Sequence, residues 1–229
     1  LTFWSGSGND VITGGNATTS ALAPRGSPLG FGDRLYGGSG RDTLSGGDGA
    51  DRVYGGSSLD VIWGDAGNDS LYGDAGDDLL YGQAGGDLLV GGFGRDRVWG
   101  GLGNDTIYGD AIIVTPGASG ESDALFGEDG DDSLDGGDAA DFVIGGIGND
   151  VYLFGRGSGA DTVVENDATP GNTDTVRFAA DVAPSEVELS RDGGASWETI
   201  DPTTPNDGSK TWIVTGPATS QAIAPRPQL

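Results

Sequence analysis

Aspartate returns every nine residues along most of this chain, and an apolar residue follows it two positions later. The clearest stretch, Gly37 to Tyr108, divides without a gap into eight nine-residue blocks, from GGSGRDTLS to GGLGNDTIY. Their common pattern is G-G-x-G-x-D-x-U-x, in which U is apolar. Calcium takes carboxylate and carbonyl oxygens as ligands, so acidic residues at this fixed spacing suggest a row of similar cation sites.

The aspartate at the sixth position is the most regular feature of the repeat. It is present in every full or partial copy: Asp10, Asp33, Asp42, Asp51, Asp60, Asp69, Asp78, Asp87, Asp96, Asp105, Asp123, Asp132, Asp141, Asp150 and Asp161. The eighth position is Ile, Leu or Val except at Tyr152. The glycines vary more, with Asp65, Asp74, Gln83 and Glu128 at the second position and Ser58 and Ala139 at the fourth. Repetition in register indicates a stacked repeat fold.

The spacing predicts a flattened coil in which the first six residues of a block turn and the last three form a short strand. Strands alternate faces, so the eighth-position side chain points inward and its two neighbours point outward. Glycine permits positive φ, which lets the turn direct its carbonyl groups toward one point. Two blocks make one coil, so the aspartates form two columns: Asp42, Asp60, Asp78 and Asp96 in one, and Asp51, Asp69, Asp87 and Asp105 in the other.

Such a coil needs a cation to become stable. One apolar residue per block cannot offset about 1–2 kcal/mol of backbone entropy for each ordered residue. The formal net charge of −25 also opposes a compact state. About ten to twelve calcium ions would come close to cancelling that charge. Magnesium fits less well, because it demands strict octahedral geometry and keeps its waters.

The blocks resemble the nonapeptides of the RTX family, the haemolysin-type calcium-binding repeats, over roughly Ser5 to Val164. The resemblance implies an all-β, right-handed parallel β-roll with two sheets. It also implies that each ion is held by the first and third carbonyls and the aspartate of one turn, and by the second and fourth carbonyls and the aspartate one coil away. Gly37, Ser39 and Asp42 would thus face Gly56, Ser58 and Asp60. The first- and third-position ligands implied in this way are Gly37, Ser39, Gly46, Asp48, Gly55, Ser57, Gly64, Ala66, Gly73, Ala75, Gly82, Ala84, Gly91, Phe93, Gly100, Leu102, Gly127, Asp129, Gly136 and Asp138.

Two segments interrupt the repeat, at about residues 16–30, which are polar, and 111–121. The first is interpreted as an extruded loop. The second is either a loop, which we favour, or a degenerate block. The roll is therefore expected to cover residues 1–165, followed by a capping and β-rich segment over residues 166–229. Strands are expected at Asp161–Glu165 and Asp174–Phe178, which would close the roll.

The C-terminal segment has fewer glycines and a different character. Strands are expected at Val187–Ser190, Trp197–Ile200 and Thr211–Thr215, whereas APRPQL at the end shows no obvious strand. The stretch SRDGGASW (Ser190–Trp197) resembles an Asp-box, a structural hairpin turn. Both ends of the sequence suggest a piece of a longer protein.

Composition excludes several classes of function. The strong negative charge disfavours nucleic acid, and no stretch is apolar enough to enter a membrane. Cysteine and histidine are absent, which removes disulfides, thiolate metal sites and the commonest general base. Paired carboxylates belong to the repeat, so no enzymatic activity is expected of this chain. A catalytic domain would lie outside it.

Aromatic residues gather at the outward ninth position: Tyr36, Tyr54, Tyr72 and Tyr108 in one column, and Trp63, Tyr81, Trp99 and Phe126 in the other. Stacked rings that shield the sheet faces are the simpler interpretation. A platform for a glycan or a neighbouring surface protein is the alternative.

Two hypotheses for function remain open. The first is a calcium-responsive folding and export module of a bacterial protein, unfolded while it passes the type I secretion machinery and folded by calcium outside the cell. The second is a structural module of a surface-layer protein or adhesin. Both place the chain outside the cell or on its surface.

Overall fold

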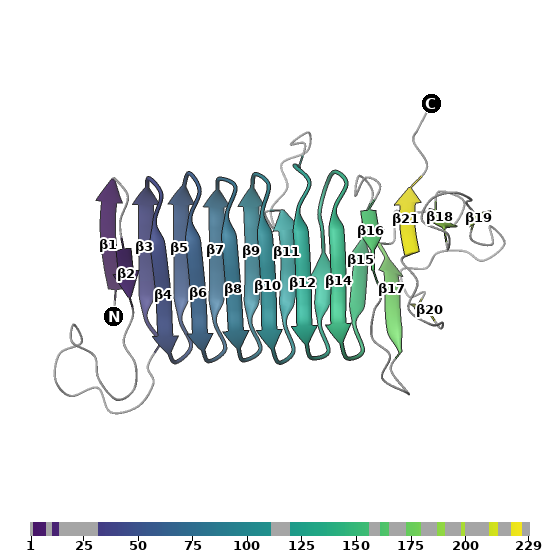
Figure 1. The fold of residues 1–229 in the computed structure, drawn as a ribbon, viewed down its shortest axis with the longest axis horizontal. Helices are drawn as coiled ribbons and strands as arrows, with labels where there is room; N and C mark the ends of the chain where they lie inside the picture. Colours follow the sequence, from purple (N-terminus) through teal and green to yellow (C-terminus); the bar gives the residue numbers. More distant parts are fainter. Residues whose placement is uncertain are drawn as a thin grey trace.

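The chain folds into an elongated solenoid built from two stacked parallel sheets (Figure 1). This computed structural model describes residues 2–7, 11–13, 32–110, 120–155, 161–164 and 173–179, together with the strand segments 187–190, 198–199, 211–214 and 221–225. Successive strands alternate between the sheets, so every second strand is a neighbour in the same sheet. In the described residues there is no helix, and hence none long and apolar enough to cross a membrane. The expected all-β, two-sheet parallel roll is confirmed.

The strands of the solenoid are longer than the three residues that we expected. Most have six residues and run from the seventh position of one block through the third position of the next, as β4 (Thr43–Asp48) does. The other strands of the solenoid are β1 (Thr2–Ser7), β2 (Val11–Thr13), β3 (Arg34–Ser39), β5 (Arg52–Ser57), β6 (Val61–Ala66), β7 (Ser70–Ala75), β8 (Leu79–Ala84), β9 (Leu88–Phe93), β10 (Arg97–Leu102), β11 (Thr106–Asp110), β12 (Ala124–Asp129), β13 (Ser133–Asp135), β14 (Phe142–Ile147), β15 (Val151–Phe154), β16 (Asp161–Val163) and β17 (Asp174–Phe178). Ladder hydrogen bonds therefore extend into the first three positions, and only positions four to six form the turn.

The second and fourth positions bend the chain. Glycines there have positive φ, for example 114° at Gly56 and 138° at Gly67. The residues that replace these glycines keep the same left-handed conformation, with φ of 83° at Ser58 and 88° at Ala139. The left-handed conformation destabilises a residue with a Cβ atom by roughly 1–2 kcal/mol. Ser58 and Ala139 are therefore expected to weaken their turns.

Pairing between coils follows the eighteen-residue period and then skips the interruptions. Asp42 and Asp60 are one coil and 18 residues apart, whereas Asp96 and Asp123 are one coil and 27 residues apart. Strand β10 accordingly pairs with β12, and β11 with β13. The coil thus resumes in register after the second interruption, and the loop near 111–121 stays a prediction. Residues 111–119 lie outside the described part of the chain, as do residues 14–31.

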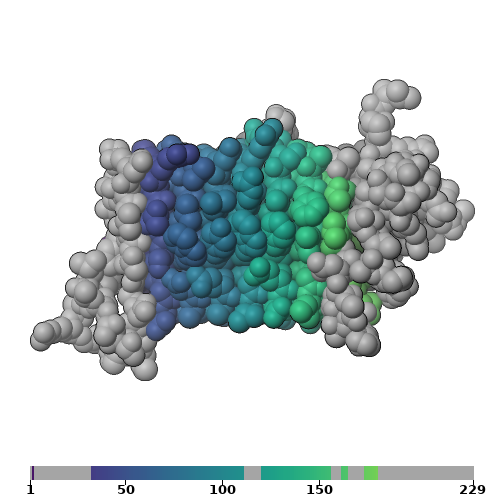
Figure 2. Space-filling view, in the orientation of Figure 1, coloured from purple at the N-terminus to yellow at the C-terminus, as the bar shows by residue number. Residues whose placement is uncertain are grey.

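The eighth-position side chains fill the narrow space between the sheets. Leu44, Ile62 and Leu80 stack in one sheet and are fully buried, and Leu35, Val53 and Leu71 are their counterparts in the other. Tyr152 takes the same inward place and is 1 % exposed. Figure 2 shows the chain advancing steadily along the long axis, so each coil packs against only the coils beside it. The stability of such a stack depends on every interface between neighbouring coils.

Antiparallel strands follow the last parallel coil. Strand β20 (Thr211–Val214) pairs with β17, and β21 (Gln221–Pro225) pairs with β16 and with β18 (Val187–Ser190), which in turn pairs with β19 (Glu198–Thr199). The expected strands at Val187–Ser190, Trp197–Ile200 and Thr211–Thr215 are thus present, the second in shortened form. The absence of a strand near the end was a wrong prediction, because β21 includes Ala224 and Pro225. Most of the Asp-box lies outside the described residues.

Candidate metal centre

The sixth-position aspartates form two continuous columns along the edges of the solenoid. In each column the backbone N–H of one aspartate donates to Oδ1 of the aspartate one coil further on, as from Asp42 to Asp60 at 2.8 Å and from Asp60 to Asp78 at 2.7 Å. The first column is Asp42, Asp60, Asp78, Asp96, Asp123, Asp141 and Asp161, and the second is Asp33, Asp51, Asp69, Asp87, Asp105, Asp132, Asp150 and Asp174. The predicted columns are therefore present and longer than expected. Asp10 lies outside the described residues.

The second carboxylate oxygen of these aspartates, Oδ2, lies in a different environment from Oδ1. Burial is nearly complete, with exposures of 0 % at Asp60 and Asp78 and 3 % at Asp51. Within the described residues, Oδ2 is buried without a hydrogen-bond partner at Asp51, Asp60, Asp69, Asp78, Asp87, Asp96, Asp105, Asp123, Asp132 and Asp141. A buried charged oxygen without a partner is costly. Its recurrence at the same place in coil after coil indicates a missing ligand rather than a local defect.

Each of these oxygens lies beside a first-position glycine, which belongs to its own block except at Asp123, where it is Gly109. A Cβ atom placed on Gly55 would lie 2.5 Å from Asp60 Oδ2 and 2.8 Å from the Gly73 carbonyl oxygen. The same arrangement recurs one block later, where a Cβ on Gly64 would lie 2.5 Å from Asp69 Oδ2. A carboxylate oxygen and a carbonyl oxygen from the next coil therefore converge beside the first-position glycine. Any side chain at this glycine would collide with both.

Burial perturbs the ionisation of these aspartates. It raises the pKa of Asp78 from 3.8 to about 8 and that of Asp123 to about 9. The backbone N–H received from the previous coil lowers the pKa in both cases, but burial outweighs it. The same cause raises the pKa to about 6 at Asp51, Asp60, Asp87 and Asp132, to about 7 at Asp69, Asp96, Asp105 and Asp141, and to about 8 at Asp161. Carboxylates so placed ionise at neutral pH only at considerable cost unless a cation joins them.

The donor set suits a hard cation that accepts main-chain oxygens. In the described residues no three acidic side chains gather tightly enough to hold a metal by themselves. Carboxylate oxygens therefore need backbone carbonyls as partners, and the carbonyl beside Asp60 Oδ2 is of this kind. Calcium takes six to eight oxygen ligands in flexible geometry and includes carbonyls readily. The residues present fit calcium.

A comparison with known protein families also indicates calcium binding. The profile described as RTX calcium-binding nonapeptide repeat (4 copies) matches residues 2–17, 29–58, 58–89, 81–111 and 118–152. The chain belongs to the RTX family. RTX nonapeptides are structural calcium-binding repeats, so this chain carries a calcium-binding β-roll. No curated protein sequence matches it.

The backbone carbonyls implied as ligands in an RTX turn differ in their surroundings. First-position carbonyls such as that of Gly73 lie beside a buried Oδ2, which here belongs to Asp60, one coil earlier. Third-position carbonyls already accept a hydrogen bond from the fourth-position N–H of the preceding coil, for example Ala84 from Gly67 at 2.8 Å. A carbonyl oxygen has two lone pairs, so this bond leaves room for a cation. The individual ligand assignments therefore remain proposals.

Two acidic residues near the sites were missed from the sequence. Asp174 ends the second column, is 5 % exposed, and accepts the Asp150 N–H at 3.0 Å. The pattern D-T-V at Asp174–Val176 repeats that at Asp161–Val163 and could have revealed it. Asp110 joins neighbouring coils just before residues 111–119, because its Oδ2 accepts the Asp138 N–H at 2.7 Å.

One edge of the RTX roll carries a further polar ladder at the fifth position. Asn68 Oδ1 accepts the Gly86 N–H at 3.1 Å, and Asn104 Oδ1 accepts the Asp131 N–H at 3.1 Å. Asp131 in turn accepts the Asn149 N–H at 2.8 Å. These bonds join successive turns of the second column. Nothing in the block pattern pointed to them.

The outward aromatic residues do stack along the roll. Tyr36, Tyr54 and Tyr72 have ring centroids 4.9 Å apart with nearly parallel planes. On the other sheet the centroids are 5.9 Å apart from Trp63 to Tyr81, 4.6 Å from Tyr81 to Trp99 and 5.3 Å from Trp99 to Phe126. Tyr108 is separated from Tyr72 by Val90, so it does not continue the first stack.

Proposed function

We propose that this chain is a calcium-dependent folding module of an exported bacterial protein. The observation that carries the proposal is the buried, unpartnered Oδ2 that recurs coil after coil beside a carbonyl oxygen. Without a cation, the roll must hold many carboxylates in a place that disfavours their charge. With calcium, the same oxygens become ligands that only the folded chain presents.

Binding of ions to the folded form alone shifts the folding equilibrium. One site contributes about 2.7 kcal/mol when free calcium is a hundred times its dissociation constant. Several sites along one stack act together, because each coil is ordered by its neighbours. A chain of this kind stays unfolded where calcium is scarce and folds where calcium reaches millimolar levels. That behaviour suits passage through the type I secretion machinery followed by folding outside the cell.

The direct test is circular dichroism at pH 7.5 during a calcium titration that starts in excess EDTA. We expect a disordered spectrum in EDTA and a cooperative gain of β signal as free calcium rises to millimolar levels. Magnesium at the same concentration serves as the matched control and should leave the chain unfolded. A full β signal in excess chelator would refute the proposal.

The alternative role, a structural module of a surface-layer protein or adhesin, is favoured by one observation. Half-buried rings form an unbroken row on one outer face, from Trp63 through Tyr81 and Trp99 to Phe126. The two roles share the calcium-dependent roll and differ in what surrounds it. Sequencing the full open reading frame separates them, because a neighbouring catalytic domain favours the first role and repeated sandwich domains favour the second.

A further inference from the structure

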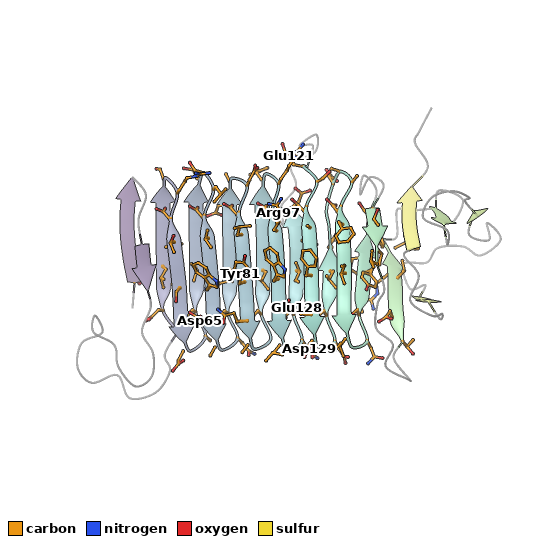
Figure 3. The ribbon with its side chains drawn as sticks, viewed as in Figure 1. Asp65, Tyr81, Arg97, Glu121, Glu128 and Asp129 are labelled. Atoms are coloured by element: carbon orange, nitrogen blue, oxygen red, sulfur yellow. The ribbon has the colours of Figure 1, made fainter. Side chains whose placement is uncertain are left out.

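The face of the eleven-stranded sheet that carries the tryptophans has a distinct layered chemistry. Figure 3 places Tyr81 near the middle of this face, with Arg97 toward one edge and Asp65 and Glu128 toward the other. Residues at the seventh, ninth and second positions of the blocks share this face, so each forms a row that crosses the strands. The ninth-position row is aromatic from Trp63 to Phe126. The second-position row is polar at Asp65, Gln83 and Glu128, and Gly101 lies between the last two.

The polar row stands at backbone positions where glycine would be more favourable. Asp65, Gln83 and Glu128 have φ of 73°, 75° and 77°, in the left-handed region that disfavours residues with a Cβ atom. Each follows an aromatic residue by two positions, so it lies beside that ring on the same face of the strand. Backbone strain that persists at a surface suggests a use for the side chain that causes it.

Two neighbouring members of the polar row are held in place before any ligand arrives. Gln83 Nε2 donates to Asp65 Oδ1 at 2.8 Å, and Ser45 Oγ donates to Asp65 Oδ2 at 2.5 Å. These contacts run along the roll, beside the aromatic row. Side chains fixed in this way lose little conformational entropy when they bind a ligand.

The two rows together suit a hydroxyl-rich ligand without charge. Aromatic rings offer apolar surface to the C–H groups of sugar rings, while carboxylate and amide oxygens accept hydrogen bonds from hydroxyl groups. Asp65 and Glu128 repel an anionic ligand, and the net charge of −25 adds to that repulsion. Charge complementarity therefore favours a neutral glycan over an acidic one.

We infer that the Trp63–Tyr81–Trp99–Phe126 row and the Asp65–Gln83–Glu128 row form a binding surface for a neutral polysaccharide lying along the solenoid axis. The surface rests on the proposed function only in that calcium must first fold the roll. A ligand that crosses the strands contacts several coils at once, so a long chain binds better than a short one.

Affinity electrophoresis in gels that contain calcium tests this inference. The probes are hydroxyethylcellulose and galactomannan as neutral polysaccharides and alginate as the anionic control. The test variant combines Asp65→Gly, Gln83→Gly and Glu128→Gly, which keep the main-chain carbonyls and relieve the left-handed strain. The matched control is Asp74→Gly, a second-position residue with φ of 70° on the other sheet.

We expect the wild type and Asp74→Gly to be retarded by at least one neutral probe, with no retardation by alginate. The triple variant should bind about tenfold or more weakly, because three hydrogen-bonding side chains are lost. Retardation by neither neutral probe, a preference for alginate, or equal binding by the triple variant would each overturn the inference. Calcium-induced β signal is recorded for every variant, so failed folding is told apart from failed glycan binding.

Discussion

Replacing Asp78 by Asn isolates the charge that the roll buries. Asp78 is fully buried, its Oδ1 accepts the Asp60 N–H at 2.7 Å, and its Oδ2 lacks a partner. Asparagine keeps the first contact and supplies a neutral NH₂ group in place of Oδ2. That group can donate to the Gly91 carbonyl oxygen, which flanks the same place beside Gly73. The substitution therefore removes a charge and a cation ligand while it preserves shape.

The expected magnitudes differ between the calcium-free and calcium-bound states. Burial raises the pKa of Asp78 from 3.8 to about 8, so at pH 7 the calcium-free fold must either bury a charge or bind a proton there. At pH 7 this difference in pKa corresponds to roughly 4 kcal/mol, which Asp78→Asn would relieve. With calcium present, loss of one partner from a buried charged contact should cost about 3–5 kcal/mol. The fold of the variant is thus expected to be less stable than that of the wild type with calcium and more stable than that of the wild type without it.

Urea unfolding in saturating calcium, followed by circular dichroism, measures the loss. With an m value of about 2 kcal/mol per molar, the midpoint should fall by roughly 2 M. The calcium midpoint for folding should rise only about twofold, because a loss of about 4 kcal/mol is spread over about ten ions that bind together. Asp77→Asn, an exposed change one residue away, is the matched control and should alter stability by less than about 0.5 kcal/mol. Equal midpoints for the two variants would refute this account of the site.

Three further predictions concern pH, the first-position glycine and the end of a column. In EDTA, acidification from pH 7.5 to 5 should increase the β signal. The pKa values of buried aspartates such as Asp69 (about 7) exceed that of an unfolded aspartate, so the folded chain binds more protons than the unfolded chain. The stability of the fold therefore falls as pH rises through that window. A decrease of the β signal on acidification would contradict this. Gly55→Ala should prevent calcium-induced folding, seen as no gain of β signal, because its Cβ would lie 2.5 Å from Asp60 Oδ2; normal folding of the variant would contradict the proposed cradle. Asp174→Asn should lower the urea midpoint in calcium by less than half as much as Asp78→Asn, because β17 has a parallel neighbour on only one side; an equal loss would show that the column does not end there.

Much of this fold could be predicted because each block repeats the same local instructions. The eighth position gave the core, since a strand buries alternate side chains and only that position is always apolar among its neighbours. The two aspartate columns followed from two blocks per coil. Strand length could not be predicted in the same way, because left-handed residues such as Gly56 and Asp74 are normally signs of a turn. Here they lie inside paired strands and bend them.

Contacts between coils were harder to foresee than contacts within a block. No pattern in one block shows that Asp60 Oδ1 receives an N–H from Asp42, because that bond depends on how closely two coils approach. The continuation of a column from Asp96 to Asp123 depends on the same kind of contact between coils. The spacing there is 27 residues instead of 18, and only the pairing of β10 with β12 shows that the coil resumes in register.

The two carboxylate oxygens of each aspartate have different roles: one specifies the pairing of coils and the other stabilises the roll. Oδ1 accepts a backbone N–H from the neighbouring coil and so fixes the register of the folded roll. Oδ2 has no such partner in the described coils from Asp51 to Asp141, apart from what a cation would supply. Under the proposed function, such a chain specifies which coils pair, and calcium determines whether it folds. Replacing every Oδ2 contact by a protein donor would, on the same proposal, give a roll that folds without calcium.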